Sequence, residues 1–155
     1  MNRDAVSRAL AKVASGIYIT SCVHDGARIG MLASFIEQAA FEPPMISMAV
    51  ARDRPLLAAL DDGGMFAVNI LGEHNRELLR VFLKAEGDPF AGHALVGNAH
   101  GLPIFAEALG WLVCKVRGKM EAGDHWLYVA EVLDGALQME HEKPMVRIRH
   151  NGFGY

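Results

Sequence analysis

Segments with the composition of strands outnumber those with helical periodicity, and the two kinds do not alternate along the chain. Six or seven segments are expected to form strands, and three short ones helices. A doubly wound parallel sheet needs helices that alternate regularly with strands. The order found here instead favours a mostly β fold with short helices, an antiparallel barrel that is covered in part by those helices.

Turn residues and apolar runs give the expected strand positions. The turn His24-Asp25-Gly26 separates two apolar runs and predicts a hairpin. The nearly continuous apolar run 45–51 is typical of a strand buried on both faces. Strands are expected at 17–23, 28–35, 45–51, 66–71, 109–120 and 127–137, with a short strand at the start of the tail 145–155.

The three helices are short, and boundary signals accompany the first two. The first follows helical spacing of apolar residues from Val6 to Val13, and Gly16 is placed to end it in a left-handed cap. The second is expected to begin at Asp53 as its N-cap. The third is expected over 73–83, where apolar residues fall on one helical face.

The segment 30–44 has the composition of a ligand-binding strand and loop. Small side chains at Ala33, Ser34 and Ala39 would let a flat ligand approach the backbone closely, and Ser34 and Gln38 add hydrogen-bonding groups. Apolar walls with a few placed polar groups are typical of a cofactor pocket. The same residues also fit an ordinary strand and loop packed under a neighbouring element, so the local pattern leaves both interpretations open.

Three further residues are candidates for chemistry. Arg52 and Arg54 bracket the expected start of the second helix, where free N–H groups and the helix dipole favour a phosphate. His125 lies in a Gly-Asp-His turn between two long strands, which would place its imidazole at the rim of a barrel. It could there bind a substrate amide or stabilise developing charge. Exposed loop arginines and a surface histidine are the alternatives.

Composition narrows the possible partners and the compartment. A net charge of −3 with 15 scattered Lys and Arg residues argues against nucleic acid. There is no apolar run of membrane-spanning length, and Asp4, Arg8 and Lys12 interrupt the N-terminus where a signal peptide would be apolar. We therefore expect a cytoplasmic protein, with one domain over 1–155 and two reduced, buried cysteines.

Two kinds of site are not supported by any motif. The seven histidines show no metal-ligand spacing, so no metal site is expected. No Gly-rich fingerprint follows a strand, so a nicotinamide or flavin nucleotide would have to bind without the dinucleotide-binding motif.

Taken in order, these segments resemble the flavin reductase-like, FMN-binding split-barrel family. No single segment is specific, but together they span about residues 5–137 in register. The matching segments are Ala14-Ser15-Gly16-Ile17-Tyr18-Ile19, Gly30-Met31-Leu32-Ala33-Ser34-Phe35, Phe41-Glu42-Pro43-Pro44, Phe66-Ala67-Val68-Asn69-Ile70-Leu71, Asp88-Pro89-Phe90-Ala91-Gly92, and Gly123-Asp124-His125 with Ala130-Glu131-Val132.

A closer likeness is to the flavin reductase-like module of cyanobacterial diflavin flavodiiron proteins. We expect that module to stand alone here, with no metallo-β-lactamase-like or flavodoxin-like part attached. The residues that carry this likeness are Met31-Leu32-Ala33-Ser34-Phe35, Gln38-Ala39, Val50-Ala51-Arg52-Asp53-Arg54 and Phe82-Leu83-Lys84.

The resemblance implies a homodimer of split barrels with FMN near the dimer interface, FAD being the alternative flavin. It also implies that His125 is the catalytic residue, placed near the nicotinamide of NADH or NADPH. The cofactor-binding residues that it implies are Met31, Leu32, Ala33, Ser34, Gln38, Ala39, Val50, Ala51, Arg52, Arg54, Phe82 and Lys84.

The expected function is that of an NAD(P)H:flavin oxidoreductase, in which a hydride passes from the nicotinamide to the flavin. A monooxygenase or another redox protein is the expected recipient of the electrons. The alternative is an FMN-binding electron carrier that a protein partner reduces. A split barrel that binds a different ligand, such as haem or a deazaflavin, is a third interpretation.

Overall fold

The computed structural model describes residues 1–84 and 86–154, and strands dominate it. In chain order the elements are α1 (Arg3–Leu10), β1 (Ser15–Gly16), β2 (Tyr18–His24), β3 (Ala27–Ala33), β4 (Ile36–Ala40), β5 (Met45–Ala51), α2 (Leu56–Asp61), β6 (Met65–Ile70), α3 (Arg76–Lys84), β7 (Gly110–Ala122), β8 (His125–Leu137) and β9 (Val146–Arg147).

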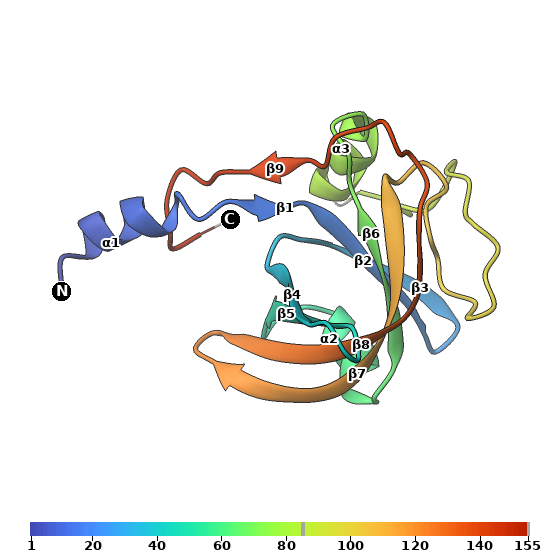
Figure 1. Cartoon of the computed structure of the whole chain (residues 1–155), viewed down its shortest axis with the longest axis horizontal. Helices are drawn as coiled ribbons and strands as arrows, with labels where there is room; N and C mark the ends of the chain where they lie inside the picture. The colour runs from blue at the N-terminus through green and yellow to red at the C-terminus, as the bar shows by residue number, and fades with distance from the viewer. Residues whose placement is uncertain (85, 155) are drawn as a thin grey trace.

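Seven of these strands form one antiparallel sheet that curls into an open barrel (Figure 1). The order across the sheet is β3-β2-β6-β7-β8-β5-β4. Its two edge strands, β3 and β4, are consecutive in the chain and are joined by Ser34 and Phe35. β3 and β4 do not pair with each other, so the barrel is split between them, and the short link Ser34–Phe35 lies at this opening.

Alternate residues of the strands fill the interior of the barrel. On β5, Ile46, Met48 and Val50 are buried, whereas the residues between them are only partly buried. Cys22 and Cys114 lie in the same core, where burial raises the pKa of the Cys22 thiol to about 11 and that of Cys114 to about 12. Both thiols are therefore protonated at neutral pH, and neither is in a disulfide.

A buried asparagine attaches the long connection between α3 and β7 to the outside of the sheet. The Asn69 amide donates to the Ile19 carbonyl and to the Ser21 hydroxyl, at 3.0 Å each. Its oxygen accepts from the Phe105 N–H at 2.9 Å. Phe105 stacks on Phe90 with 5.4 Å between ring centroids, and both belong to the apolar cluster that α3 covers.

The two ends of the chain form an arm beside the barrel (Figure 1). β9 pairs with β1, with Ser15 opposite Arg147 and Gly16 opposite Val146. Further along the tail, the Gly152 N–H donates to the Ser7 hydroxyl at 3.1 Å. Helix α1 itself buries none of its residues. The tail therefore links α1 to the rest of the molecule. No helix in the described ranges is both long enough and apolar enough to traverse a lipid bilayer.

Most of the predicted elements are confirmed, with boundaries that shift by up to three residues. The predicted hairpin forms around Asp25 and Gly26, whose φ angles of 49° and 76° suit a two-residue turn. The predicted third helix begins later, at Arg76, and the short tail strand is β9.

Two predictions about strands are wrong. A loop is predicted after the strand 28–35, but Ile36–Ala40 forms strand β4, which pairs with β5 along one side only. The middle residues of β4 are exposed, so its sequence lacks the alternation of apolar and polar residues that would predict a strand. β5 is not buried on both faces, because its outer residues remain partly accessible.

Two predictions about helix ends are also wrong. α1 does not extend to Gly16; it ends at Leu10, with Ala11 as a C-cap in right-handed helical conformation, and Gly16 lies in β1. Asp53 is not an N-cap, because α2 begins at Leu56 after Pro55, without a capping side chain.

Candidate functional site

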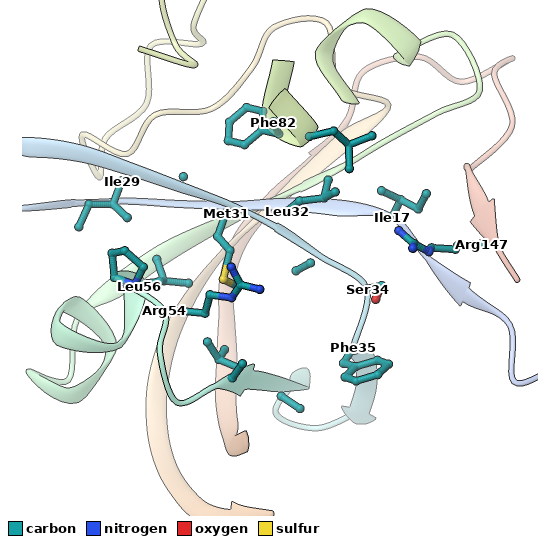
Figure 2. Close-up of a pocket in the computed structure, with 17 residues that line it drawn as sticks. Ile17, Ile29, Met31, Leu32, Ser34, Phe35, Arg54, Leu56, Phe82 and Arg147 are labelled. Carbon is teal, nitrogen blue, oxygen red and sulfur yellow. The ribbon is translucent and has the colours of Figure 1, made fainter. Parts of the chain in front are cut away.

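A cavity of about 470 Å³ lies where the barrel is split (Figure 2). One wall is β3 with the link Ser34–Phe35, and another is the end of β5 with the start of α2. Phe82 and Leu83 of α3 form a third side, and Arg147 of β9 reaches in from the C-terminal strand. Residues far apart in sequence therefore meet around one mostly apolar space.

Two local features of the sequence shape this cavity. The Ala49 N–H donates to the Phe35 carbonyl at 2.9 Å, which ties the link between β3 and β4 to β5. Gly30 lets α3 approach β3 closely, because a Cβ at this position would meet Phe82 Cε1 at 2.7 Å and Phe90 Cζ at 2.9 Å. The absence of a side chain at Gly30 thus positions Phe82 at the cavity.

The structure brings most of the predicted cofactor-binding residues together. They come from β3 and its following link, from the end of β5 and the loop after it, and from α3. Those that line the cavity are Met31, Leu32, Ala33, Ser34, Val50, Ala51, Arg54 and Phe82.

The other predicted residues lie outside the lining. Gln38 and Ala39 are on the edge strand β4, and Gln38 borders a separate cavity of about 320 Å³ at the mouth of the barrel. The Arg52 guanidinium lies over the Trp126 ring, with Cζ 4.7 Å from the ring centroid, and pairs with Glu121 at 3.7 Å. Lys84 is the exposed last residue of α3.

His125 also lies outside the lining, but it contacts a residue that belongs to it. Its ring centroid is 5.8 Å from that of Phe35, and its side chain is only 15% exposed. His125 Nδ1 is 2.7 Å from Asp124 Oδ1. This hydrogen bond is the main reason why the pKa of the Asp124 carboxyl lies below its ordinary value. The imidazole is thus oriented by a carboxylate, and Phe35 lies between it and the cavity.

Several lining residues were not among the predicted contacts. Ile17 and Leu56 are buried core residues, and most of the others are partly buried or exposed apolar residues. Their place in the lining depends on tertiary packing, and no local signal marks them as ligand contacts. Phe35 and Gly30 were within the segment that carried the resemblance, and their position next to Ser34 and Met31 was the available signal. The additional lining residues are Ile17, Ile29, Gly30, Phe35, Ala49, Pro55, Leu56, Leu83 and Arg147.

The charge at the cavity is positive. Arg54 and Arg147 are the charged residues of its lining, and Arg54 also lies 3.6 Å from the carboxylate of Asp53. Figure 2 shows the Arg54 side chain beside Met31 and the Arg147 side chain beside Ile17. Apolar walls with two guanidinium groups suit a flat apolar ligand that carries phosphate. Within residues 1–84 and 86–154, no group of three or more His, Cys, Asp or Glu is placed to hold a metal ion.

Comparisons with known proteins agree with this architecture. The family model of the flavin reductase like domain matches residues 10–153. Diflavin flavoprotein A 1 of Synechocystis sp. is 36% identical over 134 residues, which cover 84% of this chain and 23% of that protein. The chain thus spans about a quarter of the length of the curated relatives it matches.

Two solved structures show the same fold over almost the whole chain. The nitrilotriacetate monooxygenase component B homolog from Mycobacterium thermoresistibile has a TM-score of 0.85 at 25% identity, covering 94% of this chain and 82% of that one. The styrene monooxygenase flavin reductase from Pseudomonas putida S12 has a TM-score of 0.80 at 26% identity, covering 93% and 94%. The resemblance and fold class predicted from the sequence are confirmed: this chain belongs to the flavin reductase-like domain family and has its split-barrel fold.

Proposed function

We propose that this protein is an NAD(P)H-dependent flavin reductase that binds FMN in the cavity at the split of the barrel. The observation that carries the proposal is the convergence of β3, β5, α3 and β9 on one apolar cavity with two arginines. Its volume of about 470 Å³ falls within the range of roughly 300–1,000 Å³ for small-molecule sites. Membership of the family and the names of the relatives support a flavin as the ligand.

The residues of the cavity fit a flavin. Ala33, Ala49 and Ala51 have small side chains that leave room for a flat ring system beside the backbone. Met31, Leu32 and Val50 supply apolar surface around it. Arg54 supplies a guanidinium for the phosphate of FMN, a group that arginine can bind through two parallel hydrogen bonds. FAD is the alternative, since the cavity is open to solvent on one side of these residues.

When bound, the flavin supplies the redox chemistry, because it can accept a hydride from a nicotinamide. The role that we propose for this chain is to bind and orient the two ligands. His125, held by Asp124 and lying against Phe35, would orient the nicotinamide amide next to the cavity. Ordered placement of two reactants is itself a large source of rate acceleration.

We also propose that the functional unit is a homodimer. Apolar side chains that a monomer would expose gather on the arm at the two ends of the chain: Val13 is 62% exposed, Val146 61% and Ile148 59%. Exposed apolar side chains that cluster in this way mark interaction surfaces. A dimer that buries them would have its interface beside the Arg147 side of the cavity. Ile148→Asp should then shift the protein towards the monomer in light scattering.

A second candidate function has its own support. The relatives in Synechocystis and Nostoc are named diflavin flavoproteins, a name that implies two flavin groups in one chain. An FMN-binding electron carrier that takes electrons from a protein partner would use the same cavity. The two solved structures are named for monooxygenase systems, which makes a monooxygenase the first recipient of electrons to test.

Anaerobic titration of the FMN-loaded protein with NADH and then with NADPH distinguishes the two functions. Bleaching of the visible flavin absorbance by either nucleotide is the result expected of a reductase, and it names the donor. An unchanged spectrum with flavin demonstrably bound would overturn the reductase and favour the electron carrier.

A further inference from the structure

Along β9 and the two residues that follow it, apolar side chains face solvent and arginine side chains face the protein. Side chains of a strand alternate between two sides, and the apolar ones normally face the protein. Here Val146 and Ile148 are 61% and 59% exposed. The residues between and after them face the cavity wall: Arg147 lines the cavity, and the Arg149 guanidinium lies over Phe35, with Cζ 5.1 Å from the ring centroid. Two arginines therefore point inward and two β-branched apolar residues outward.

The guanidinium of Arg147 is half-buried and has no partner in the part of the chain that the structure describes, residues 1–84 and 86–154. The neighbouring Arg149 differs, because its guanidinium donates to the Leu10 carbonyl at 3.2 Å. Arg54, the other arginine of the cavity, lies near the carboxylate of Asp53. A partly buried cation without a counter-charge is unfavourable unless an anion joins it. An anionic ligand bound at Arg147 would supply the missing counter-charge.

The backbone on both sides of Arg147 is fixed. Before it, the Met145 N–H donates to the Leu71 carbonyl at 2.8 Å. At Arg147 itself the chain pairs with Ser15, and after it the Arg149 N–H donates to the Ala11 carbonyl at 3.2 Å. These three attachments lie on different parts of the fold, so the position of Arg147 is set before any ligand arrives. Such preorganisation lowers the entropy cost of binding.

The two arginines of the cavity belong to different ends of it. Arg54 follows β5 and lies beside Met31 and Leu56, whereas Arg147 enters beside Ile17 (Figure 2). The segment that follows β9 places Arg149 on Phe35, and His125 also contacts that ring. Arg147 is thus at the end of the cavity where His125 lies.

We propose that Arg147 binds a phosphate group of the nicotinamide nucleotide and so determines affinity for the electron donor rather than for the flavin. This inference rests on the proposed function, because it assigns the donor to the His125 end of the same cavity. FMN carries one phosphate, and Arg54 is the residue of the cavity to which the proposed function assigns it. A second, preorganised guanidinium suits a second phosphorylated ligand, since guanidinium groups bind phosphate bidentately.

The test compares Arg147→Met with Arg54→Met and with the control Arg28→Met. Arg28 is exposed at the start of β3 and does not line the cavity, so its variant removes the same charge elsewhere. FMN affinity is measured from the quenching of flavin fluorescence in the apoprotein. Binding of oxidised NAD⁺ and NADP⁺ to the FMN-loaded protein is measured by calorimetry, which needs no turnover.

Arg147→Met should raise the Kd for the nicotinamide nucleotides about tenfold, with the FMN Kd unchanged within about twofold. Arg54→Met should show the reverse pattern, and Arg28→Met should match the parent in both. A loss confined to NADP⁺ identifies the 2′-phosphate as the group bound, whereas an equal loss for both identifies the pyrophosphate. If Arg147→Met instead weakens FMN binding and leaves nucleotide binding intact, the assignment is wrong.

Failure of the proposed function would look different. If NAD⁺ and NADP⁺ bind to the parent but NADH and NADPH do not reduce its flavin, the reductase is overturned and the role of Arg147 in nucleotide binding still holds. If neither oxidised nucleotide binds to the FMN-loaded parent, the role of Arg147 is overturned as well.

Discussion

The phenyl ring of Phe35 contacts both the imidazole of His125, at 5.8 Å between ring centroids, and the guanidinium of Arg149, at 5.1 Å from Cζ to the ring centroid. Three separate parts of the chain thus meet at one aromatic residue of the cavity wall: the start of β8, the link between β3 and β4, and the segment after β9. A change at any of them is expected to affect how a second ligand is oriented beside the cavity.

His125→Ala should slow reduction of the bound flavin by NAD(P)H about tenfold or more while leaving the FMN Kd nearly unchanged. The reason is that His125 touches Phe35 but does not line the cavity. Stopped-flow absorbance gives the rate and fluorescence quenching the affinity. His141→Ala, which changes an exposed histidine in the connection before β9, is the control. Equal rates in His125→Ala and parent would remove His125 from the mechanism.

Asn69→Ala should lower the free energy of unfolding by about 2–4 kcal/mol. The substitution leaves the Ile19 carbonyl and the Phe105 N–H without the buried partner that they have in the parent. Urea denaturation followed by Trp fluorescence measures the change. Asn151→Ala, at an exposed asparagine of the tail, should change the free energy by less than about 0.5 kcal/mol. A loss at Asn69 no larger than that of the control would show that this residue does not hold the 102–105 segment.

Gly30→Ala should destabilise the protein by about 1–3 kcal/mol, because the new methyl group would overlap the rings of Phe82 and Phe90. It should also weaken FMN binding, since Phe82 lines the cavity. Adding Phe82→Leu to Gly30→Ala should recover part of the lost stability, since the shorter side chain makes room. A double-mutant cycle by urea denaturation tests this coupling. Strictly additive effects would mean that the strand and helix are not in the contact described.

The acid sensitivity of folding should depend on Asp61. Hydrogen bonds from Lys119, at 2.7 Å, and from the Tyr128 hydroxyl, at 2.6 Å, hold the pKa of its carboxyl below the ordinary value. A depressed carboxyl pKa stabilises the fold above the unfolded pKa of about 4, and this contribution is lost as the pH falls through the folded pKa.

Asp61→Asn should therefore be less stable than the parent at pH 6 and should approach it at pH 3. Because both Asp61 and Lys119 are partly exposed, solvent screening keeps the difference small. Urea midpoints between pH 6 and pH 3 measure it, with Asp62→Asn, the exposed neighbour at the end of α2, as the control. Parallel pH profiles of the parent and Asp61→Asn would contradict the role of this carboxyl.

Much of the sheet follows from local patterns, and the exceptions have physical causes. The hairpin of β2 and β3 was predictable from the turn Asp25-Gly26, and the long pair of β7 and β8 from two apolar runs around Gly123. β4 was missed because Glu37, Gln38 and Ala39 are exposed on an edge strand, where a one-sided pairing imposes no apolar alternation. An edge strand of this kind is defined by its partner rather than by its own composition.

The residues of the candidate site also fall into those that local sequence could predict and those that depend on distant contacts. Met31, Ala33 and Ser34 were predictable as lining residues because they follow one another along one strand and its link. Arg147 was not, because its place in the cavity depends on pairing between β9 and β1, which are separated by about 130 residues of chain. The residues near Arg147 in sequence do not indicate which distant strand it pairs with. Arg52 was predicted beside Arg54, but its side chain stacks on Trp126 instead.

The most direct test of the account is a titration of the apoprotein with FMN, followed by flavin fluorescence, in the parent, in Ala51→Phe and in Ala58→Phe. Ala51 lines the cavity at the end of β5, whereas Ala58 is exposed on α2 outside the lining. We predict saturable quenching with one FMN per chain in the parent and in Ala58→Phe, and loss of binding in Ala51→Phe, whose ring occupies the cavity. Equal binding in all three proteins, or no binding to the parent, would contradict the claim that this cavity holds the flavin.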